Sequence, residues 1–102
     1  MLLDRIQSSA NTLAEITYAA GENVVHTIYA IYYGYAGGTT SGGIVILVDA
    51  VVKLRVPVTA TGAGFLPFPP VSFNRGAAVV VRIEAGGASV VGDLNVLHAA
   101  NP

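Results

Sequence analysis

The feature that most constrains the fold is a series of short apolar runs with turn residues between them. Valine, isoleucine, threonine, tyrosine and phenylalanine fill the runs, whereas glycine and proline interrupt them. No long stretch repeats its apolar residues with the period of a helix. The pattern predicts an all-β protein with about seven or eight strands, and such close spacing without helices is typical of a β-sandwich or barrel.

One segment is unusual among these runs because it contains three prolines. Residues 65–70 read Phe-Leu-Pro-Phe-Pro-Pro, and proline has no N–H group to donate to a neighbouring strand. We expect an extended crossing segment that lays Phe65 and Phe68 on the core. This crossing and the long connections favour a jelly-roll or Greek-key sandwich over simple hairpins. The expected strands are residues 13–18, 24–35, 44–48, 51–60, 71–73, 77–85 and 89–98.

The chain length of 102 residues is that of a single domain. Residues 1–11 are expected to form an extended N-terminal arm or one weak turn, since Ser8, Ser9 and Asn11 are poor helix formers. Residues 12–102 are expected to form the β-sandwich domain. An arm of this kind could be removed without unfolding the domain.

The chain carries little charge for its size. Hydrophobic residues make up 53% of it and charged residues 11%, whereas an ordinary domain has about 25% charged residues. A small domain has a large surface to cover and should be richer in charge than average. The excess apolar surface predicts burial against a partner subunit, a large assembly or a membrane.

Two classes of partner are disfavoured by the distribution of charge. The apolar stretch 24–36 is too short for a membrane-spanning helix of about 20 residues, and glycines in residues 37–43 end it. Asp4 and Arg5 interrupt any secretion signal at the N-terminus. The net charge is −1 and no basic cluster is present to bind phosphate groups. We therefore expect neither a membrane nor a nucleic acid as partner.

Two of the expected strands are apolar on both faces. Residues 24–35 alternate between two apolar sets, and residues 44–48 contain only apolar side chains. In a thin sandwich this pattern predicts a second layer from another chain. Tyrosine suits interfaces because it has an apolar ring and a polar tip, although these tyrosines could also be ordinary core and rim residues. The candidate interface residues are Tyr29, Tyr33, Tyr35, Leu2, Leu3 and Ile6.

Groups that could perform catalysis or bind a metal are scarce. The chain has no cysteine, and His26 and His98 are its only histidines, without the spacing of a metal site. His26 alternates with apolar residues and is expected to be packed or at an interface, whereas His98 is expected to be exposed. The six carboxylates are dispersed and are expected to be solvated. No Gly-x-Ser-x-Gly or phosphate-binding motif occurs. We expect no enzyme activity, no metal and no cofactor.

The second half of the chain carries a set of motifs in a particular order. Residues 43–50 read GIVILVDA, residues 51–58 read VVKLRVPV, and residues 68–76 read FPPVSFNRG, followed by Ala77, Val79 and Val81. Over roughly residues 40–97 the chain resembles small virion proteins of tailed bacteriophages and prophages. The resemblance implies a β-sandwich capsid decoration (cement) protein. It also implies a homotrimer on the capsid surface, with the major capsid protein as partner, and no catalytic residues.

The leading hypothesis is therefore a bacteriophage virion protein that binds the outer shell as a homo-oligomer and stabilises it. A neck, tail or fibre component is the alternative within the same class. A carbohydrate-binding adhesion module is the alternative from another class. That function requires aromatic platforms beside exposed polar residues, and the chain has no tryptophan.

Overall fold

The structure is a computed structural model that describes residues 2–38 and 40–101, without the side chains of residues 67–70. The described residues form eight strands, which confirms the all-β prediction. Among them there is no helix with the length and apolarity to span a bilayer. The strands are β1 (Leu2–Gln7), β2 (Ala14–Tyr18), β3 (Val25–Ala36), β4 (Gly42–Val48), β5 (Val51–Val58), β6 (Gly62–Ser72), β7 (Val79–Ile83) and β8 (Val91–Asn101).

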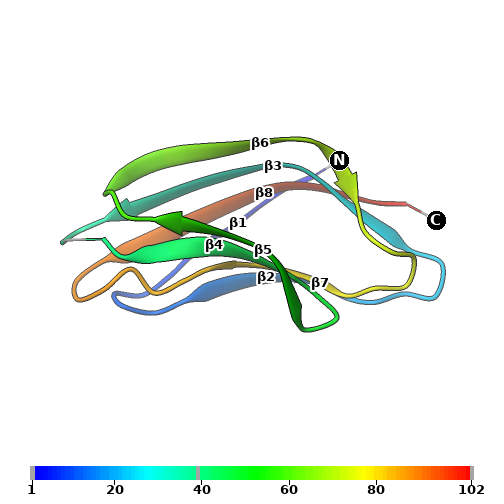
Figure 1. Cartoon of the computed structure of the whole chain (residues 1–102), viewed down its shortest axis with the longest axis horizontal. Coiled ribbons are helices and arrows are strands. Elements are labelled where there is room, and N and C mark those ends of the chain that lie inside the picture. The colour runs from blue at the N-terminus through cyan, green and yellow to red at the C-terminus, as the bar shows by residue number, and fades with distance from the viewer. Residues whose placement is uncertain (1, 39, 102) are drawn as a thin grey trace.

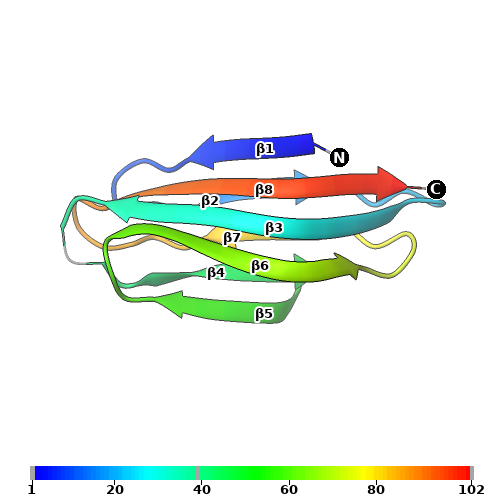
Figure 2. The ribbon, with the colours of Figure 1, turned by 90° about the horizontal axis from the view of Figure 1, so that it is seen from above.

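The strands form two four-stranded sheets that pack face to face (Figure 1). The first sheet has the order β1-β8-β3-β6 and the second has the order β2-β7-β4-β5. Figure 2 looks onto the first sheet and shows β1 at its edge. Every connection except the β4–β5 hairpin joins strands of different sheets. This is the strand order of an eight-stranded jelly roll, so the predicted jelly-roll sandwich is confirmed.

The core lies between the two sheets and follows the alternation of side chains along a strand. In β8 every second residue is buried, and Leu94 and Val96 are fully enclosed. In β7 the buried residues are Val79, Val81 and Ile83. These side chains pack against buried side chains of β3 and β4 in one core cluster. The alternation along β7 and β8 therefore identifies which of their side chains face the core.

Strand β3 changes its inward face part of the way along. Its register with both β6 and β8 shifts between Ile28 and Ala30, so Tyr29 forms a bulge. Before the bulge His26 and Ile28 are buried, whereas after it Ile31 and Tyr35 are buried. Even-numbered residues thus face inward first and odd-numbered residues face inward later. This switch explains why both alternating sets of residues in β3 look apolar in the sequence.

Strand β4 is buried on both faces by its own chain, so our inference that this pattern requires another chain is wrong. On its outer face Val45 is buried and lies in register between Arg82 and Arg55. Arg82 pairs with Glu15 at 2.6 Å and Arg55 with Glu84 at 2.7 Å. Arginine side chains held in this way cover apolar neighbours with their aliphatic stems.

The segment expected to be an N-terminal arm is instead the edge strand β1, which pairs along its whole length with β8. The chain after β1 is also held. The Ser8 amide donates to the Gly92 carbonyl at 2.8 Å, and the Gly92 amide donates to Ser8 Oγ at 2.7 Å. Further on, the Asn11 amide donates to the Val90 carbonyl at 2.9 Å. This segment is therefore part of the sandwich and not a free extension.

The proline-rich segment is also a strand, contrary to our expectation of a crossing outside the sheets. Strand β6 spans Gly62–Ser72 and pairs with β3, with Pro67 opposite Ala30. Proline is tolerated here because β6 is an edge strand with a neighbour on one side only. Phe65 is half exposed on the outside of the sheet and does not lie on the core. The Phe68 side chain lies outside the described residues.

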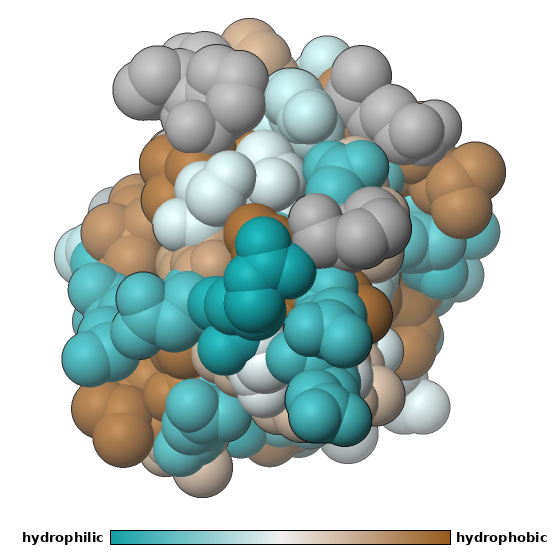
Figure 3. Space-filling view, turned by 90° about the vertical axis from the view of Figure 1, so that its right-hand side faces the viewer, coloured by the Kyte–Doolittle hydropathy of each residue, from teal (hydrophilic) through white to brown (hydrophobic). Residues whose placement is uncertain are grey.

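The sandwich has one polar end. Figure 3 views the end of the sandwich that carries both termini, and hydrophilic residues occupy much of its centre. The loops after β2 and after β6 contribute exposed residues such as Glu22 and Asn74. Arg75 connects these two loops by donating from Nη1 to the Asn23 carbonyl at 3.1 Å.

Candidate functional site

The outward side of the first sheet, which we call the outer face, carries the most distinctive surface residues. Leu94 and Val96 of β8 point into the core, so Asp93 and Asn95 point outward. Residues opposite one another in an antiparallel ladder share a face. The register therefore gives two rows across the four strands, Gln7–Asp93–Gly34–Ala63 and Arg5–Asn95–Tyr32–Phe65.

Two aromatic rings stack in the open on this outer face. Tyr32 of β3 and Phe65 of β6 lie opposite each other in register, and their ring centroids are 4.6 Å apart with planes inclined by 19°. Tyr32 is 44% exposed and Phe65 is 49% exposed. Aromatic rings usually contribute large apolar area to a core or an interface. Here the two rings stack on each other, and about half of each side chain remains in solvent.

Polar side chains lie beside the aromatic pair on β1 and β8. Arg5 Nη2 and Asp93 Oδ2 form an ion pair of 2.8 Å across the two strands. Asp93 Oδ1 is buried and accepts no hydrogen bond from the part of the chain that the structure describes. Asn95 lies between Arg5 and Tyr32 in the register. The outer face is thus polar on one side and aromatic on the other.

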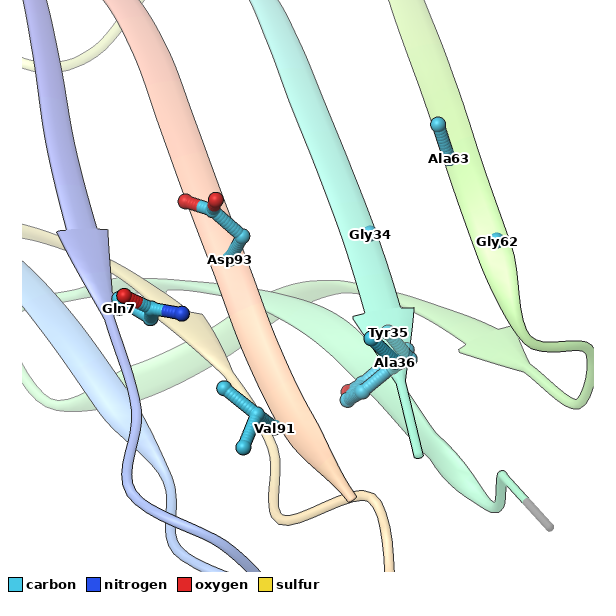
Figure 4. A pocket seen from close by; sticks show the side chains of 8 residues that line it. All are labelled: Gln7, Gly34, Tyr35, Ala36, Gly62, Ala63, Val91 and Asp93. Atoms are coloured by element: carbon cyan, nitrogen blue, oxygen red, sulfur yellow. The ribbon is translucent and has the colours of Figure 1, made fainter. Parts of the chain in front are cut away.

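A shallow depression of about 320 Å³ adjoins these residues. Figure 4 shows Gln7 and Asp93 from β1 and β8 on one side, and Gly34, Gly62 and Ala63 from β3 and β6 on the other. The depression is open because the residues on β3 and β6 are small. A Cβ atom on Gly34 would lie 3.4 Å from the Gly62 carbonyl oxygen, which is an ordinary contact. Packing would therefore allow an alanine at position 34. Because Gly34 has no side chain, the space above the sheet stays open at this position.

The predicted interface residues fall into different surroundings. Leu2 and Leu3 lie at the start of β1 and are 70% and 59% exposed. Ile6 is partly buried and packs against the core. Tyr29 is half-buried at the bulge of β3. Tyr33 also packs against the core. The two leucines are thus the most exposed members of the predicted set.

Tyr35 is a core residue and is not available to a partner. Its side chain is 2% exposed and belongs to the core cluster. The hydroxyl donates to the Glu84 carbonyl at 2.8 Å and accepts from the Gly43 amide at 3.1 Å. Burial raises the pKa of the Tyr35 hydroxyl above its ordinary value. The hydroxyl therefore joins β3 of the first sheet to backbone groups of the second.

The two histidines meet between the sheets. His26 Nδ1 and His98 Nε2 are 2.9 Å apart, and His26 Nε2 donates to the Ala19 carbonyl at 2.8 Å. With neutral rings, His98 Nε2 must donate to His26 Nδ1, since one nitrogen of a neutral imidazole donates and the other accepts. The His98 ring stacks on Tyr18, whose hydroxyl donates to Asp4 at 2.8 Å. Both histidines are buried, so the expectation that His98 is exposed is wrong.

This arrangement predicts a loss of stability in mild acid. Burial, followed by the neighbouring His26, lowers the pKa of His98 below its ordinary value of 6.5. The unfolded chain then binds a proton near pH 6.5 that the folded chain does not bind, so the free energy of unfolding falls as the pH drops below 6.5. Thermal unfolding measured between pH 7.5 and 5 should show a decreasing Tm. The variant His98→Gln should have a flatter profile, and an unchanged pH dependence in that variant would contradict the assignment.

No cluster of ligands suited to a metal ion is found within residues 2–38 and 40–101. Such a cluster would consist of three or more histidine, cysteine, aspartate or glutamate side chains. The histidine pair comprises two such side chains, and both nitrogens of His26 and Nε2 of His98 already take part in hydrogen bonds.

Sequence reasoning did not identify the aromatic pair. Tyr32 and Phe65 are far apart in the sequence, and the bulge at Tyr29 determines which tyrosines of β3 face outward. Phe65 was assigned to the core because its segment was not expected to pair with β3. The alternation in 89–98, which places Asp93 and Asn95 on one face of a strand, is a signal that could have identified the polar half.

Comparisons with known proteins establish little beyond these observations. No protein-family model matches the chain, and no curated protein matches it. Among solved structures, the insecticidal delta-endotoxin Cry8Ea1 from Bacillus thuringiensis is similar, with 12% sequence identity and a TM-score of 0.49. The match covers 94% of this chain and 20% of the toxin chain. The chain thus spans about a fifth of that protein, and a likeness this weak carries no inference about function.

Proposed function

We propose that this chain is a structural protein of a tailed-bacteriophage virion. In this proposal it is a capsid decoration (cement) protein that binds the outer shell as a homo-oligomer, as a homotrimer in the simplest case, and stabilises it. The low charge, the jelly-roll fold and the resemblance of residues 40–97 support the proposal. Viral capsid domains are among the proteins that use this fold, although fold alone does not determine function.

The observation that carries the proposal is the exposed edge of β1. The strand contains no proline, its charged residues Asp4 and Arg5 are engaged by Tyr18 and Asp93 of the same chain, and it begins with two exposed leucines. Its backbone pairs with β8 on one side, and its other side is an edge of the first sheet. An edge of this kind is a ready site for pairing with another chain. The strand therefore offers both backbone hydrogen bonds and apolar contacts to a neighbour.

The other three edges of the sandwich are less suited to pairing. Strand β6 contains several prolines, and β5 contains Lys53, Arg55 and Pro57. Strand β2 has five residues and is the edge opposite β5. Proline, charge and short length are the means by which proteins protect their edges. The residues of the four edge strands thus favour association through β1. The partner would be a neighbouring subunit or the major capsid protein.

The double variant Leu2→Ser/Leu3→Ser should lower self-association of the purified protein. Each leucine contributes about 1.5–3 kcal/mol when its exposed side chain becomes fully buried, so two of them account for much of a weak interface. Mass measured by light scattering over a range of concentrations should shift toward that of the monomer. The same variant should bind less well to capsid shells that lack the native protein.

The matched control is Val51→Ser/Val52→Ser. These valines at the β4–β5 hairpin are also strongly exposed, but they belong to the second sheet. The control should keep the mass and the shell binding of the native protein. Equal loss in both variants, or no change in either, would count against association through β1.

A further inference from the structure

We infer that the outer face of the first sheet binds a neutral saccharide, with Tyr32 and Phe65 as the platform and Asp93, Asn95 and Gln7 as hydrogen-bonding groups. The inference goes beyond the proposed virion role, because it assigns a ligand class to a surface distinct from the β1 edge. It rests on the geometry of four neighbouring strands.

The aromatic pair has the properties of a sugar platform. The two rings stack with nearly parallel planes and are half exposed, so the outward part of the stacked pair is an apolar surface in solvent. The face of an aromatic ring carries partial negative charge, so it attracts the weakly positive C–H groups of a pyranose ring. Sugars with mostly equatorial hydroxyl groups present such C–H groups on both faces. A saccharide lying on Tyr32 and Phe65 would cover apolar surface that is otherwise in water.

The polar groups stand where the hydroxyl groups of such a sugar would be. Asn95 is opposite Tyr32 in register, and Asp93 is one row away beside Gln7. Asp93 Oδ2 is paired with Arg5, but Oδ1 has no hydrogen-bond partner among the described residues. An unpaired buried acceptor is costly, and a donated hydroxyl hydrogen bond would remove that cost. Oδ1 is covered in the structure, so contact with a sugar hydroxyl group requires neighbouring side chains to move.

The charge of the site selects a neutral ligand. The cation on the outer face, Arg5, is already paired with Asp93, and the chain as a whole has a net charge of −1. A phosphate or carboxylate group would be repelled by Asp93 without gaining a free cation. A nucleic acid could stack its bases on the rings, but its backbone would meet this repulsion. A sugar brings hydroxyl groups that donate to the carboxylate and has no charge to be repelled.

The size of the site indicates weak binding of a short saccharide, with about two sugar residues in contact. The depression of about 320 Å³ is at the lower end of the range for small-molecule pockets. It adjoins the row that holds the aromatic pair, so one sugar residue can lie on the rings while the next enters the depression. An affinity near 1 mM, which corresponds to about 4 kcal/mol, is expected for so open a site. Weak single sites become effective when an oligomer presents several copies.

The test is an NMR titration of the full-length protein with cellotetraose, lactose and mannobiose as neutral probes. At least one probe should bind with a Kd of about 1 mM and shift the ring signals of Tyr32 and Phe65. Sialyllactose, which adds a carboxylate to lactose, should bind more weakly than lactose if lactose binds. Failure of all three neutral probes at about 10 mM, ten times the expected Kd, would overturn the inference.

Variants locate the binding. Tyr32→Ser should weaken it at least about tenfold, because the variant removes one of the two rings on which the sugar lies. Asp93→Asn removes the acceptor charge and Gly34→Ala partly fills the depression, and each should weaken binding several-fold. Tyr32→Phe keeps the platform and should bind like the native protein, as should Val52→Ser on the second sheet. Unaltered binding in Tyr32→Ser, with Tm confirming that each variant is folded, would overturn the inference.

Discussion

Replacing Tyr35 with alanine is expected to destabilise the protein by about 3–5 kcal/mol, the usual cost of removing a buried aromatic side chain. The ring lies in the core, and its hydroxyl group accepts from the Gly43 amide and donates to the Glu84 carbonyl. A small domain has a free energy of unfolding of about 5–15 kcal/mol, so this loss removes a large part of it. Urea unfolding followed by circular dichroism measures the change.

Two variants separate the contributions of the ring and the hydroxyl group. Tyr35→Phe keeps the ring and leaves two backbone groups unpaired, so we expect a loss of about 1–3 kcal/mol. Tyr32→Ala removes an exposed tyrosine from the same strand and should cost about 1 kcal/mol through the lost stacking on Phe65. If Tyr35→Ala were as mild as Tyr32→Ala, Tyr35 would not be a core residue.

Deleting residues 1–11 is expected to lower Tm by at least about 10 °C or to prevent folding, because about 1 kcal/mol shifts Tm by roughly 4–8 °C in a domain of this size. The deletion removes β1 and its pairing with β8. It also removes Ile6, which packs on the core, and Asp4, which accepts from Tyr18. Burying an isoleucine side chain alone contributes about 1.5–3 kcal/mol. Differential scanning calorimetry measures the change in Tm.

The full-length variant Leu2→Ser/Leu3→Ser is the control for this deletion. Both leucines are exposed, so their replacement should change Tm by only a few degrees while β1 remains paired. A truncated protein that kept the native Tm would restore the expectation of a dispensable arm.

The fold class could be predicted because its signals are local. Short apolar runs, turn residues and the alternation in residues 77–85 and 89–98 all have the period of a strand. The jelly-roll order was favoured for a related reason, since long connections do not suit hairpins. The edge strands β1 and β6 were missed because their sequences are atypical. Pairing with one neighbour tolerates the prolines of β6. In β1, Arg5 and Gln7 lie on the outer face whereas Asp4 accepts a hydrogen bond from Tyr18, so polar residues occur on both faces of the strand.

The candidate site could be predicted only in part because it depends on long-range pairing. Whether Tyr32 or Tyr33 faces outward is determined by the bulge at Tyr29, which the sequence does not mark with glycine. The stacking of Tyr32 on Phe65 requires β6 to lie beside β3, and that pairing joins residues distant in the chain. The meeting of His26 and His98 has the same origin. Each of these contacts results from the register between strands.

The inference from the two-sided apolar pattern of β4 shows a further limit. The pattern was interpreted as a need for a second chain, but the paired arginines at positions 55 and 82 flank the outer face of Val45. A long side chain that is polar in a sequence can thus act as apolar cover in a sheet. The exposed large apolar residues include Leu2 and Leu3 of β1, Tyr32 and Phe65 of the outer face, and Val51 and Val52 of the β4–β5 hairpin.

The most direct test of the proposed virion role is a cryo-EM reconstruction of the native particle that carries this protein. The proposal predicts density for the jelly roll on the outer shell at threefold or quasi-threefold positions, with the β1 edge against a neighbouring subunit or the major capsid protein. Density confined to the tail or neck, or no density for the protein on the particle, would contradict the role in capsid decoration.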